Sequence, residues 1–305
     1  MPVEPGELEK LRRFFDDHDF TKGCLVLDLD GTALTEDQGR IFISPAVQAG
    51  IRAIHEFKRP IILNTLRFPL SVIRTIGNAW YELADIPVPT VLLNGSILGH
   101  IHCVGERLEY EEIAAYPMTE HEIKLVLDGV TELLGKGIDE ILLFYYARDW
   151  RLGEALWTPK AERVEGLRKK FVSASKVVSC SLDELNDELR SKEMCMMSLF
   201  VDRPEDTLMA YQHSKRNSFF TRKGVDKAYG LKEIAKKFSV SLDHSVGAGD
   251  TEMDSFLSAV GLAVVVGGRR LSFSGKTDTL RVGNPSDLGE LLSAWAEISH
   301  KTAPL

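Results

Sequence analysis

The chain has 305 residues, of which 44% are hydrophobic and 27% charged, and its formal net charge is −8. This length predicts two domains with enough apolar material for sizeable cores. An acidic chain lacks the cationic excess that binds nucleic acid, and no apolar run approaches the roughly 18 residues of a membrane span. The four cysteines form no C-x-x-C pair, and no apolar segment near the N-terminus is typical of a secretory signal, so we expect a cytoplasmic protein.

Short apolar segments alternate with helical segments over the first hundred residues. The pattern predicts helices at 4–17, 44–58 and 69–84, and strands at 23–28, 60–64 and 90–93. Strands that are apolar throughout are typical of a parallel sheet covered by helices on both faces. The alternation therefore predicts right-handed crossovers and a doubly wound sheet.

The pattern changes after the turn signal Asn94-Gly95 and returns near residue 224. In between we expect a hairpin at 96–111, helices that begin at the capping boxes of Thr119 and Ser181, and strands at 140–146 and 194–201. Beyond 224, helices are expected at 224–238, 251–259 and 286–298, with strands at 244–247 and 261–266. The predicted fold class is α/β, with a doubly wound, Rossmann-like core of residues 1–96 and 206–305. An α+β domain of residues 97–205 is inserted into it.

Acidic residues follow the first predicted strand. Because side chains alternate along a strand, Asp28 and Asp30 lie on one side, about 7 Å apart along an extended chain. Two carboxylates that close repel each other unless a cation or a shared proton relieves them. An ordinary acidic turn at Asp30-Gly31 is the alternative interpretation.

Polar residues also follow the second predicted strand and precede the helix at 224–238. The hydroxyl of Thr65 suits a phosphate, and Arg67 suits an anion or a neighbouring carboxylate, although taken alone a helix cap and a surface arginine are the favoured interpretation. Lys227 in the first turn of a helix opposes the helix dipole, which predicts a compensating carboxylate or phosphate unless the lysine is simply solvated.

A second acidic pair follows the strand at 244–247. Asp250 and Asp254 are four residues apart and share one face of the predicted helical turn, where they are either caps or ligands. Ligands of open α/β sheets bind beyond the carboxyl ends of the strands. The four carboxylates together therefore predict a hard-cation site for Mg²⁺, in which an aspartate can also act as a nucleophile.

The ordered set of motifs resembles the haloacid dehalogenase superfamily of phosphotransferases over nearly the whole chain. Within it, the sequence is similar to the Cof-like sugar-phosphatase branch, which carries a cap domain after the third core strand. The matching motifs are Asp28-x-Asp30-Gly-Thr, Thr65, Lys227 in Gly-Val-Asp-Lys, and Gly-Asp250 through Asp254. Two positions differ from the usual pattern: Leu66 stands where the branch has glycine, and Met253 where it has asparagine.

The resemblance implies a role for each of these residues. Asp28 is the implied nucleophile, and Asp30 the acid that protonates the leaving group and then activates water. Mg²⁺ is held by Asp28, the backbone carbonyl of Asp30, Asp250 and, directly or through water, Asp254. The phosphoryl oxygens are held by Thr65 and Lys227. The further candidates for substrate contact are Arg67, Asn94 and, in the inserted domain, Arg148 and Arg151.

The function expected from this set is Mg²⁺-dependent hydrolysis of a sugar phosphate or similar small organic phosphate. A phosphomutase, which returns the phosphoryl group to a second hydroxyl, and a phospho-ligand binding protein without turnover remain alternatives. His100 and His102 alternate on a strand-like segment, but no further ligand accompanies them in the sequence, which favours surface histidines over a zinc pair. The expected partner is a small phosphorylated metabolite, and the sequence leaves the oligomeric state open.

Overall fold

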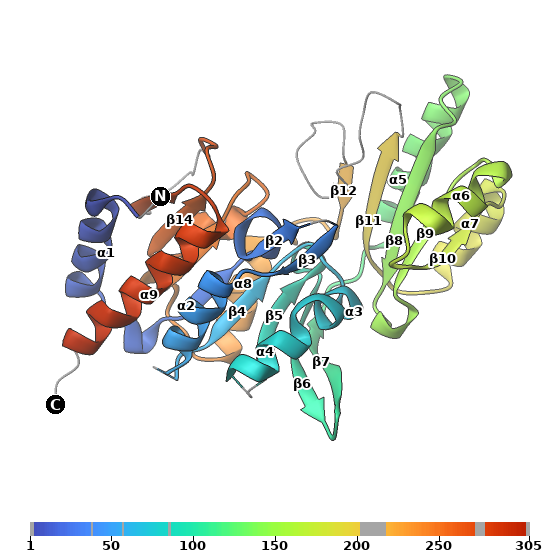
Figure 1. Cartoon of the computed structure of the whole chain (residues 1–305). Helices are drawn as coiled ribbons and strands as arrows, with labels where there is room; N and C mark the ends of the chain where they lie inside the picture. Colours follow the sequence, from blue (N-terminus) through green and yellow to red (C-terminus); the bar gives the residue numbers. More distant parts are fainter. Residues whose placement is uncertain are drawn as a thin grey trace.

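Two β-sheets organise the computed structural model, which describes residues 3–37, 39–56, 58–84, 87–201, 218–271 and 278–302. The larger sheet has eight strands in the order β15-β14-β13-β1-β4-β5-β6-β7, and the smaller has five in the order β10-β9-β8-β11-β12. Figure 1 shows the two sheets in separate units that lie side by side. We call the unit around the larger sheet the core and the other the inserted unit.

Six strands of the eight-stranded sheet are parallel, and a hairpin completes one edge. The parallel strands are β1 (Leu25–Leu27), β4 (Ile61–Asn64), β5 (Val88–Leu92), β13 (Val246–Gly249), β14 (Leu262–Val266) and β15 (Asp278–Val282). The antiparallel hairpin is β6 (Ile97–Val104) with β7 (Arg107–Ala115). Because β1 lies between β4 and β13, segments far apart in the chain end at one place.

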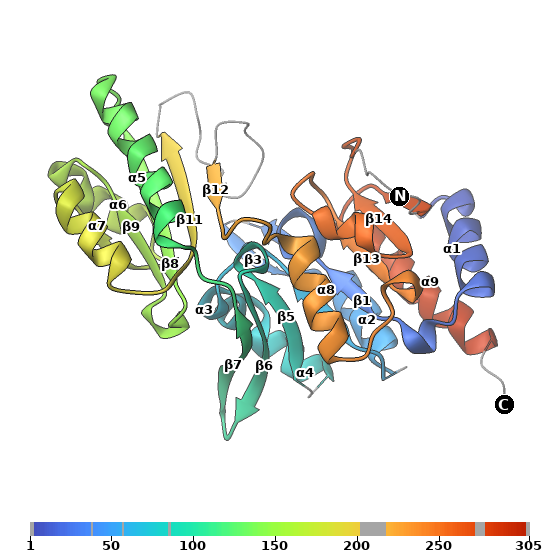
Figure 2. The same ribbon diagram turned by 180° about the vertical axis from the view of Figure 1, so that it is seen from behind.

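Helices cover both faces of this sheet, as the apolar strands predict. One face packs against α1 (Pro5–Asp17), α2 (Pro45–His55) and α9 (Pro285–Thr302), and the other against α8 (Lys227–Lys237) (Figures 1 and 2). Side chains of β1 alternate between the two layers, with Leu25 and Leu27 in one apolar cluster and Val26 in the other. The expected helix at 69–84 is present as α3 (Pro69–Val72), a π-helical turn and α4 (Asn78–Ala84).

The inserted unit contains a mixed sheet with α-helices on both faces. Its helices are α5 (Glu120–Gly135), α6 (Val164–Lys170) and α7 (Leu182–Arg190), and its strands are β8 (Ile141–Ala147), β9 (Glu154–Trp157), β10 (Ala174–Val178), β11 (Met194–Val201) and β12 (Ser218–Phe220). Both predicted capping boxes are present, at Thr119 and Ser181. The fold class predicted from the sequence is therefore confirmed.

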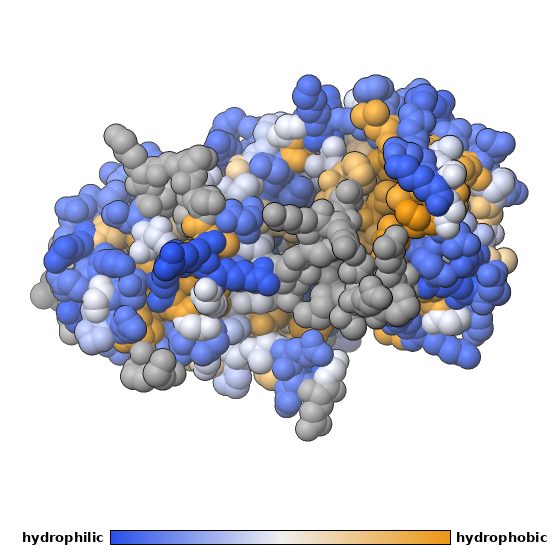
Figure 3. Space-filling model, turned by 90° about the horizontal axis from the view of Figure 1, so that it is seen from above, coloured by the Kyte–Doolittle hydropathy of each residue, from blue (hydrophilic) through white to orange (hydrophobic). Residues whose placement is uncertain are grey.

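One face of this sheet packs against α5 and α7, and the other packs against α6 and the core. Leu143 and Tyr145 pack with α5 and α7, whereas Phe144 and Tyr146 belong to the apolar cluster that continues into the core. The ring of Tyr146 lies 5.6 Å from that of Phe68, between centroids. Seen from above, the described surface is mostly hydrophilic, and the main hydrophobic area lies right of centre, over the inserted unit (Figure 3).

The predicted boundary at residue 97 is wrong in one respect. The hairpin of β6 and β7 pairs with β5 and extends the core sheet, so the inserted unit begins only with α5. Its other boundary, predicted at residue 206, lies outside the described residues, although β12 after this gap belongs to the inserted sheet. Alternation of apolar and polar residues identifies a hairpin but not the sheet that the hairpin joins. The sequence alone therefore placed this hairpin in the wrong unit.

Other predicted elements differ in detail. The helix expected at 251–259 is a turn followed by a 3-10 helix at Ser255–Ala259. The small hairpin of β2 (Leu34–Asp37) and β3 (Arg40–Ile43) and the edge strand β15 are present in addition to the predicted elements. Among the described residues, no helix combines the length and apolar character required to cross a membrane.

Candidate active site

The site lies beyond the carboxyl ends of β1, β4 and β13. Asp28 follows β1 directly, and its backbone N–H donates to the carbonyl of Ala248 in β13 at 3.0 Å. The acidic cavity at this edge has a volume of about 20 Å³. It is lined by Asp28, Asp30, Thr65, Leu66, Lys227, Asp250, Thr251 and Met253.

Lys227 bridges two buried carboxylates in this cavity. Its Nζ lies 2.6 Å from Oδ1 of Asp28 and 2.6 Å from Oδ1 of Asp254, and all three side chains are almost completely buried. Burial alone lowers the pKa of the lysine, but the two carboxylates outweigh it and the net shift is upward. Lys227 is the first residue of α8, so these acids also offset the unfavourable helix dipole.

Asp254 is held by the backbone as well as by the lysine. Its Oδ2 accepts hydrogen bonds from the N–H groups of Asp250, at 2.9 Å, and Thr251, at 3.0 Å. A Cβ on Gly249 would lie 2.7 Å from Cγ of Asp254, so only glycine fits there. Asp254 therefore positions both Lys227 and the loop that carries Asp250.

Asp250 projects toward the loop after β1. Burial first, and then the neighbouring Asp254 carboxylate, raise the pKa of Asp250 to about 7. The hydroxyl of Thr32 approaches its Oδ1 at 3.4 Å. Gly31 has a φ of +79°, and a Cβ on it would lie 2.4 Å from Oδ2 of Asp250, so the close approach of the two loops requires glycine.

Asp28 has a pKa well above the usual value for an aspartate. Burial is the largest cause and the Asp254 carboxylate the next, while Lys227 opposes them. Within the described part of the chain, the hydrogen bonds of its carboxylate reach only Oδ1, from Lys227. The second oxygen, Oδ2, is left without a donor.

Asp30 is bound by Arg67 on both oxygens. Nε of the arginine lies 2.7 Å from Oδ2 and Nη2 lies 2.6 Å from Oδ1. Nη1 donates to the hydroxyls of Ser71, at 3.2 Å, and Thr75, at 2.9 Å. Thr65 is buried beside this pair, and its hydroxyl accepts the backbone N–H of Arg67 at 3.3 Å.

The donor set fits a divalent cation with oxygen ligands. Carboxylate oxygens of Asp28, Asp250 and Asp254 all lie within 4.8 Å of one another. Their three negative charges face the single positive charge of Lys227, because Arg67 is paired with Asp30. A dication balances the remaining two charges, and carboxylates together with water are typical Mg²⁺ ligands.

Three predicted substrate contacts lie away from the acidic cavity. Asn94 adopts a left-handed conformation, with a φ of 56°, in the turn that leads from β5 into β6, and it does not line the cavity. Arg148 donates to Glu112 and to Glu193, at 2.7 and 3.0 Å. It and Arg151 line a separate groove of about 780 Å³, which shares no described residue with the cavity.

Sequence reasoning missed the residues that support the site. Asp226 caps α8 through the N–H of Tyr229 at 2.7 Å and accepts the hydroxyl of Ser255 at 2.9 Å. Ser255 in turn accepts the N–H of Ala228 at 3.1 Å, so the start of α8 is joined to the loop after Asp254. The sequence did contain one indication of this support: Asp226 stands directly before Lys227, where a helix-capping residue is expected.

Comparisons with solved structures identify the same fold in several proteins. BT1666 from Bacteroides thetaiotaomicron, a phosphatase of the haloalkanoate (HAD) superfamily, superposes with a TM-score of 0.65 at 16% identity over 92% of this chain and 96% of its own. BT4131, a HAD subclass IIB sugar phosphatase, gives 0.61 at 20% identity over 91% and 99%. TM0651 from Thermotoga maritima gives 0.61 at 17% identity over 93% and 98%.

These similarities establish a shared architecture, including an inserted unit. None of the curated proteins compared with this chain matches it. The sequence does match the family of haloacid dehalogenase-like hydrolases over residues 25–269, which includes every acid of the cavity together with Thr65 and Lys227. On that match, the chain belongs to the haloacid dehalogenase-like hydrolases.

Proposed function

We propose that the protein is a Mg²⁺-dependent phosphomonoesterase that hydrolyses a sugar phosphate or a similar small organic phosphate through an aspartyl-phosphate intermediate. The observation that carries this proposal is the buried bridge Asp28–Lys227–Asp254, in which Oδ2 of Asp28 has no hydrogen-bond donor among the described residues. A carboxylate held on one oxygen and free on the other suits nucleophilic attack at phosphorus. The phosphatase relatives of the same fold support the assignment.

The proposal gives each step to a residue of this chain. Oδ2 of Asp28 attacks phosphorus, while Lys227 and the hydroxyl of Thr65 hold the phosphoryl oxygens. When Arg67 releases one of its oxygens, the Asp30 carboxyl can carry the proton that it donates to the leaving oxygen, and it then removes a proton from the water that hydrolyses the aspartyl-phosphate. A bound Mg²⁺ would supply positive charge against the carboxylates and the phosphoryl group.

The size of the cavity gives the inserted unit a part in this reaction. About 20 Å³ accommodates one water molecule, but a phosphoryl group with its leaving alcohol needs more space. Leu66 and Met253 line the cavity, so movement of these side chains would make room for substrate. We infer that the inserted unit acts as a lid whose opening admits substrate and whose closure excludes water.

Hydrolysis of p-nitrophenyl phosphate, with and without Mg²⁺, tests the proposed activity. We expect phosphate release by the wild type with Mg²⁺, none by Asp28→Asn, and full activity of the control Asp16→Asn, whose carboxylate is exposed on α1. Mass spectrometry of the acid-quenched wild type should detect phosphate on the peptide that contains Asp28. Full activity of Asp28→Asn would refute the proposed nucleophile.

A panel of phosphorylated sugars distinguishes the alternative functions. Release of inorganic phosphate supports hydrolysis, whereas recovery of an isomerised sugar phosphate identifies a phosphomutase. Binding of sugar phosphates without turnover of any compound identifies a binding protein. The natural substrate is the panel member with the highest kcat/KM.

A further inference from the structure

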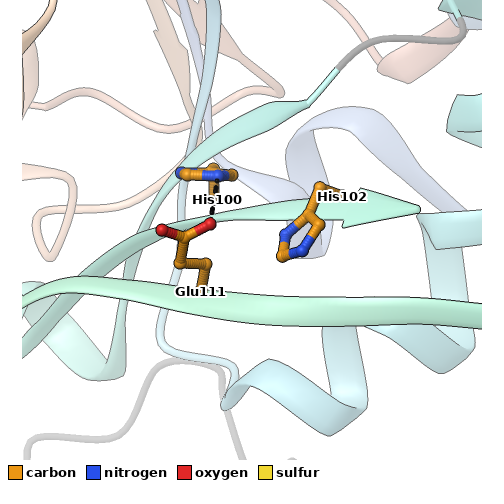
Figure 4. Close-up of side chains that lie close together, drawn as sticks. All are labelled: His100, His102 and Glu111. Atoms are coloured by element: carbon orange, nitrogen blue, oxygen red, sulfur yellow. Dashed lines mark ion pairs between the residues drawn. The ribbon is translucent and has the colours of Figure 1, made fainter. Parts of the chain in front are cut away.

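The hairpin at the edge of the core sheet carries a group of side chains that the proposed reaction does not use. His100 and His102 are two residues apart on β6, so their rings lie on one face. Glu111 on β7 is the direct register partner of His100. Figure 4 shows the three side chains gathered over this face of the hairpin. The glutamate is the third ligand that the sequence pattern alone did not reveal.

The distances among these side chains match the requirements of a metal ion. Nε2 of His100 lies 3.2 Å from Oε2 of Glu111, and one donor atom from each of the three residues lies within 4.8 Å of the others. A tetrahedral ion with bonds of about 2.0–2.1 Å separates neighbouring donors by roughly 3.3–3.4 Å. The Glu111 side chain is 63% exposed, so it is free to close the remaining gap.

His102 provides a second, independent observation. Its Nδ1 is buried and has no hydrogen-bond partner among the described residues. A buried polar atom without a partner is energetically costly, and a cation is one ligand that removes this cost. The ion pair of His100 with Glu111 does not involve this nitrogen.

We propose that His100, His102 and Glu111 form a second metal site, which takes a divalent transition-metal ion with Zn²⁺ as the best fit. Two imidazoles and one carboxylate suit Zn²⁺, whereas the all-oxygen acidic cavity suits Mg²⁺. The two sites therefore differ in the ion that they select.

The second site opens into the larger groove. His102 and Glu111 line this groove of about 780 Å³, together with Trp150 and Arg151 of the inserted unit. Zinc sites with three protein ligands keep a fourth position for water or another ligand. That position is reached from the groove, so the ion would lie where the core hairpin faces the inserted unit.

Zinc binding to the full chain tests the proposal when the acidic cavity is disabled. The background is Asp250→Asn, stripped with a chelator and titrated calorimetrically with Zn²⁺ in excess Mg²⁺. We expect one equivalent of Zn²⁺ to bind, and its affinity to fall in His102→Ala and in Glu111→Gln. The loss should exceed the roughly 10–100-fold that outer-shell partners cause. Glu106→Gln, at the exposed hairpin tip, is the matched control and should bind normally.

Co²⁺ supplies a readout that does not depend on affinity alone. Co²⁺ bound to two imidazoles and a carboxylate should give the visible absorption of a four- or five-coordinate ion, and this absorption should disappear in Glu111→Gln. Because Glu111 is exposed, this variant should keep the wild-type Tm in chelator. Absence of Zn²⁺ binding in Asp250→Asn, or equal binding by Glu111→Gln, would overturn the proposal. Failure of phosphate hydrolysis would not affect it.

Discussion

Arg67 and Asp30 form a two-point ion pair, with Nε–Oδ2 and Nη2–Oδ1 distances of 2.7 and 2.6 Å. The third nitrogen of the guanidinium is held by the hydroxyls of Ser71 and Thr75. The arginine thus joins the loop after β1 to the helical stretch after β4. Its planar fork sets the direction in which the Asp30 carboxylate points.

Replacing the guanidinium of Arg67 by an ammonium group should disturb the orientation of the Asp30 carboxylate more than the charge beside it. Arg67→Lys keeps the cation but loses the second hydrogen bond to Asp30, so we predict a fall in kcat of about 10²-fold with a smaller change in KM. Steady-state kinetics on p-nitrophenyl phosphate measure the two constants. Ser71→Ala removes only one support of the arginine and should be far less affected. Equal kcat values for Arg67→Lys and wild type would show that the fork is dispensable.

Asp30 itself is the proposed proton donor and acceptor. Asp30→Asn removes the titrating group but keeps its size, and we predict that turnover slows by roughly 10²–10⁴. Single-turnover experiments should show both formation and hydrolysis of the aspartyl-phosphate slowed. Near-full steady-state turnover by this variant would contradict the assigned role.

Lys227 is predicted to stabilise the fold as well as the reaction. Lys227→Met leaves the buried carboxylates of Asp28 and Asp254 without their counter-charge, and we expect the metal-free protein to lose about 3–5 kcal/mol of unfolding free energy. Urea denaturation measures this loss. The control is Lys232→Met, an exposed lysine of the same helix, which should change little. Mg²⁺ should restore part of the stability, and an unchanged urea midpoint would disprove the stabilising role.

The acidic cavity should make Mg²⁺ binding depend on pH. Burial and the Asp254 carboxylate raise the pKa of Asp250 to about 7, and burial raises that of Asp28 as well. A carboxyl with a raised folded-state pKa binds more protons in the folded protein. Its contribution therefore lowers metal-free stability as pH rises from about 4, the unfolded value, to about 7.

Binding of the ion must displace these protons, so the apparent Mg²⁺ affinity should weaken as pH falls below about 7. Calorimetric titration with Mg²⁺ at about pH 6 and about pH 8 measures the difference. In chelator, Asp250→Asn should show a flatter decline of Tm between the acidic and neutral ranges than the wild type. An affinity that is equal at both pH values would contradict this prediction.

Leu66 is an apolar side chain in a cavity that is lined mainly by polar groups. Its side chain lines the acidic cavity and is buried in the core cluster. We predict that Leu66→Gly lowers KM for bulky phosphate esters, because the cavity enlarges, and lowers stability by about 2–5 kcal/mol, because a buried leucine is lost. Kinetics on esters of increasing size and thermal unfolding test the two effects. A KM that is independent of ester size in both proteins would rule out Leu66 as the constriction.

The sequence predicted the cavity better than it predicted the rest of the site. Asp28, Asp30 and Asp250 follow apolar strands, and the carboxyl ends of parallel strands meet at one edge, so local pattern was sufficient to bring them together. The partner of Arg67 was not determined by local pattern, because an anion and a carboxylate fit it equally. The geometry resolves this choice in favour of Asp30.

The predictions for the inserted unit were less successful for a physical reason. Arg148 and Arg151 follow a strand whose chain direction leads to the groove rather than to the cavity, and a sequence does not specify how two sheets face each other. The hairpin at 96–111 was recognised, but the sheet that it extends depends on non-local pairing with β5. Likewise, Glu111 joins the two histidines only through the register of β6 and β7.

The bridge between Asp28 and Lys227 spans a separation of 199 residues. During synthesis on a ribosome, β1 emerges early and β4 soon after it, but its other neighbour, β13, is translated only after the inserted unit. Until then one edge of β1 lacks its backbone partners and Asp28, the proposed nucleophile, lacks its cation. The nascent chain is therefore most vulnerable to misassembly at β1, and a truncation that ends before α8 leaves this vulnerability permanent.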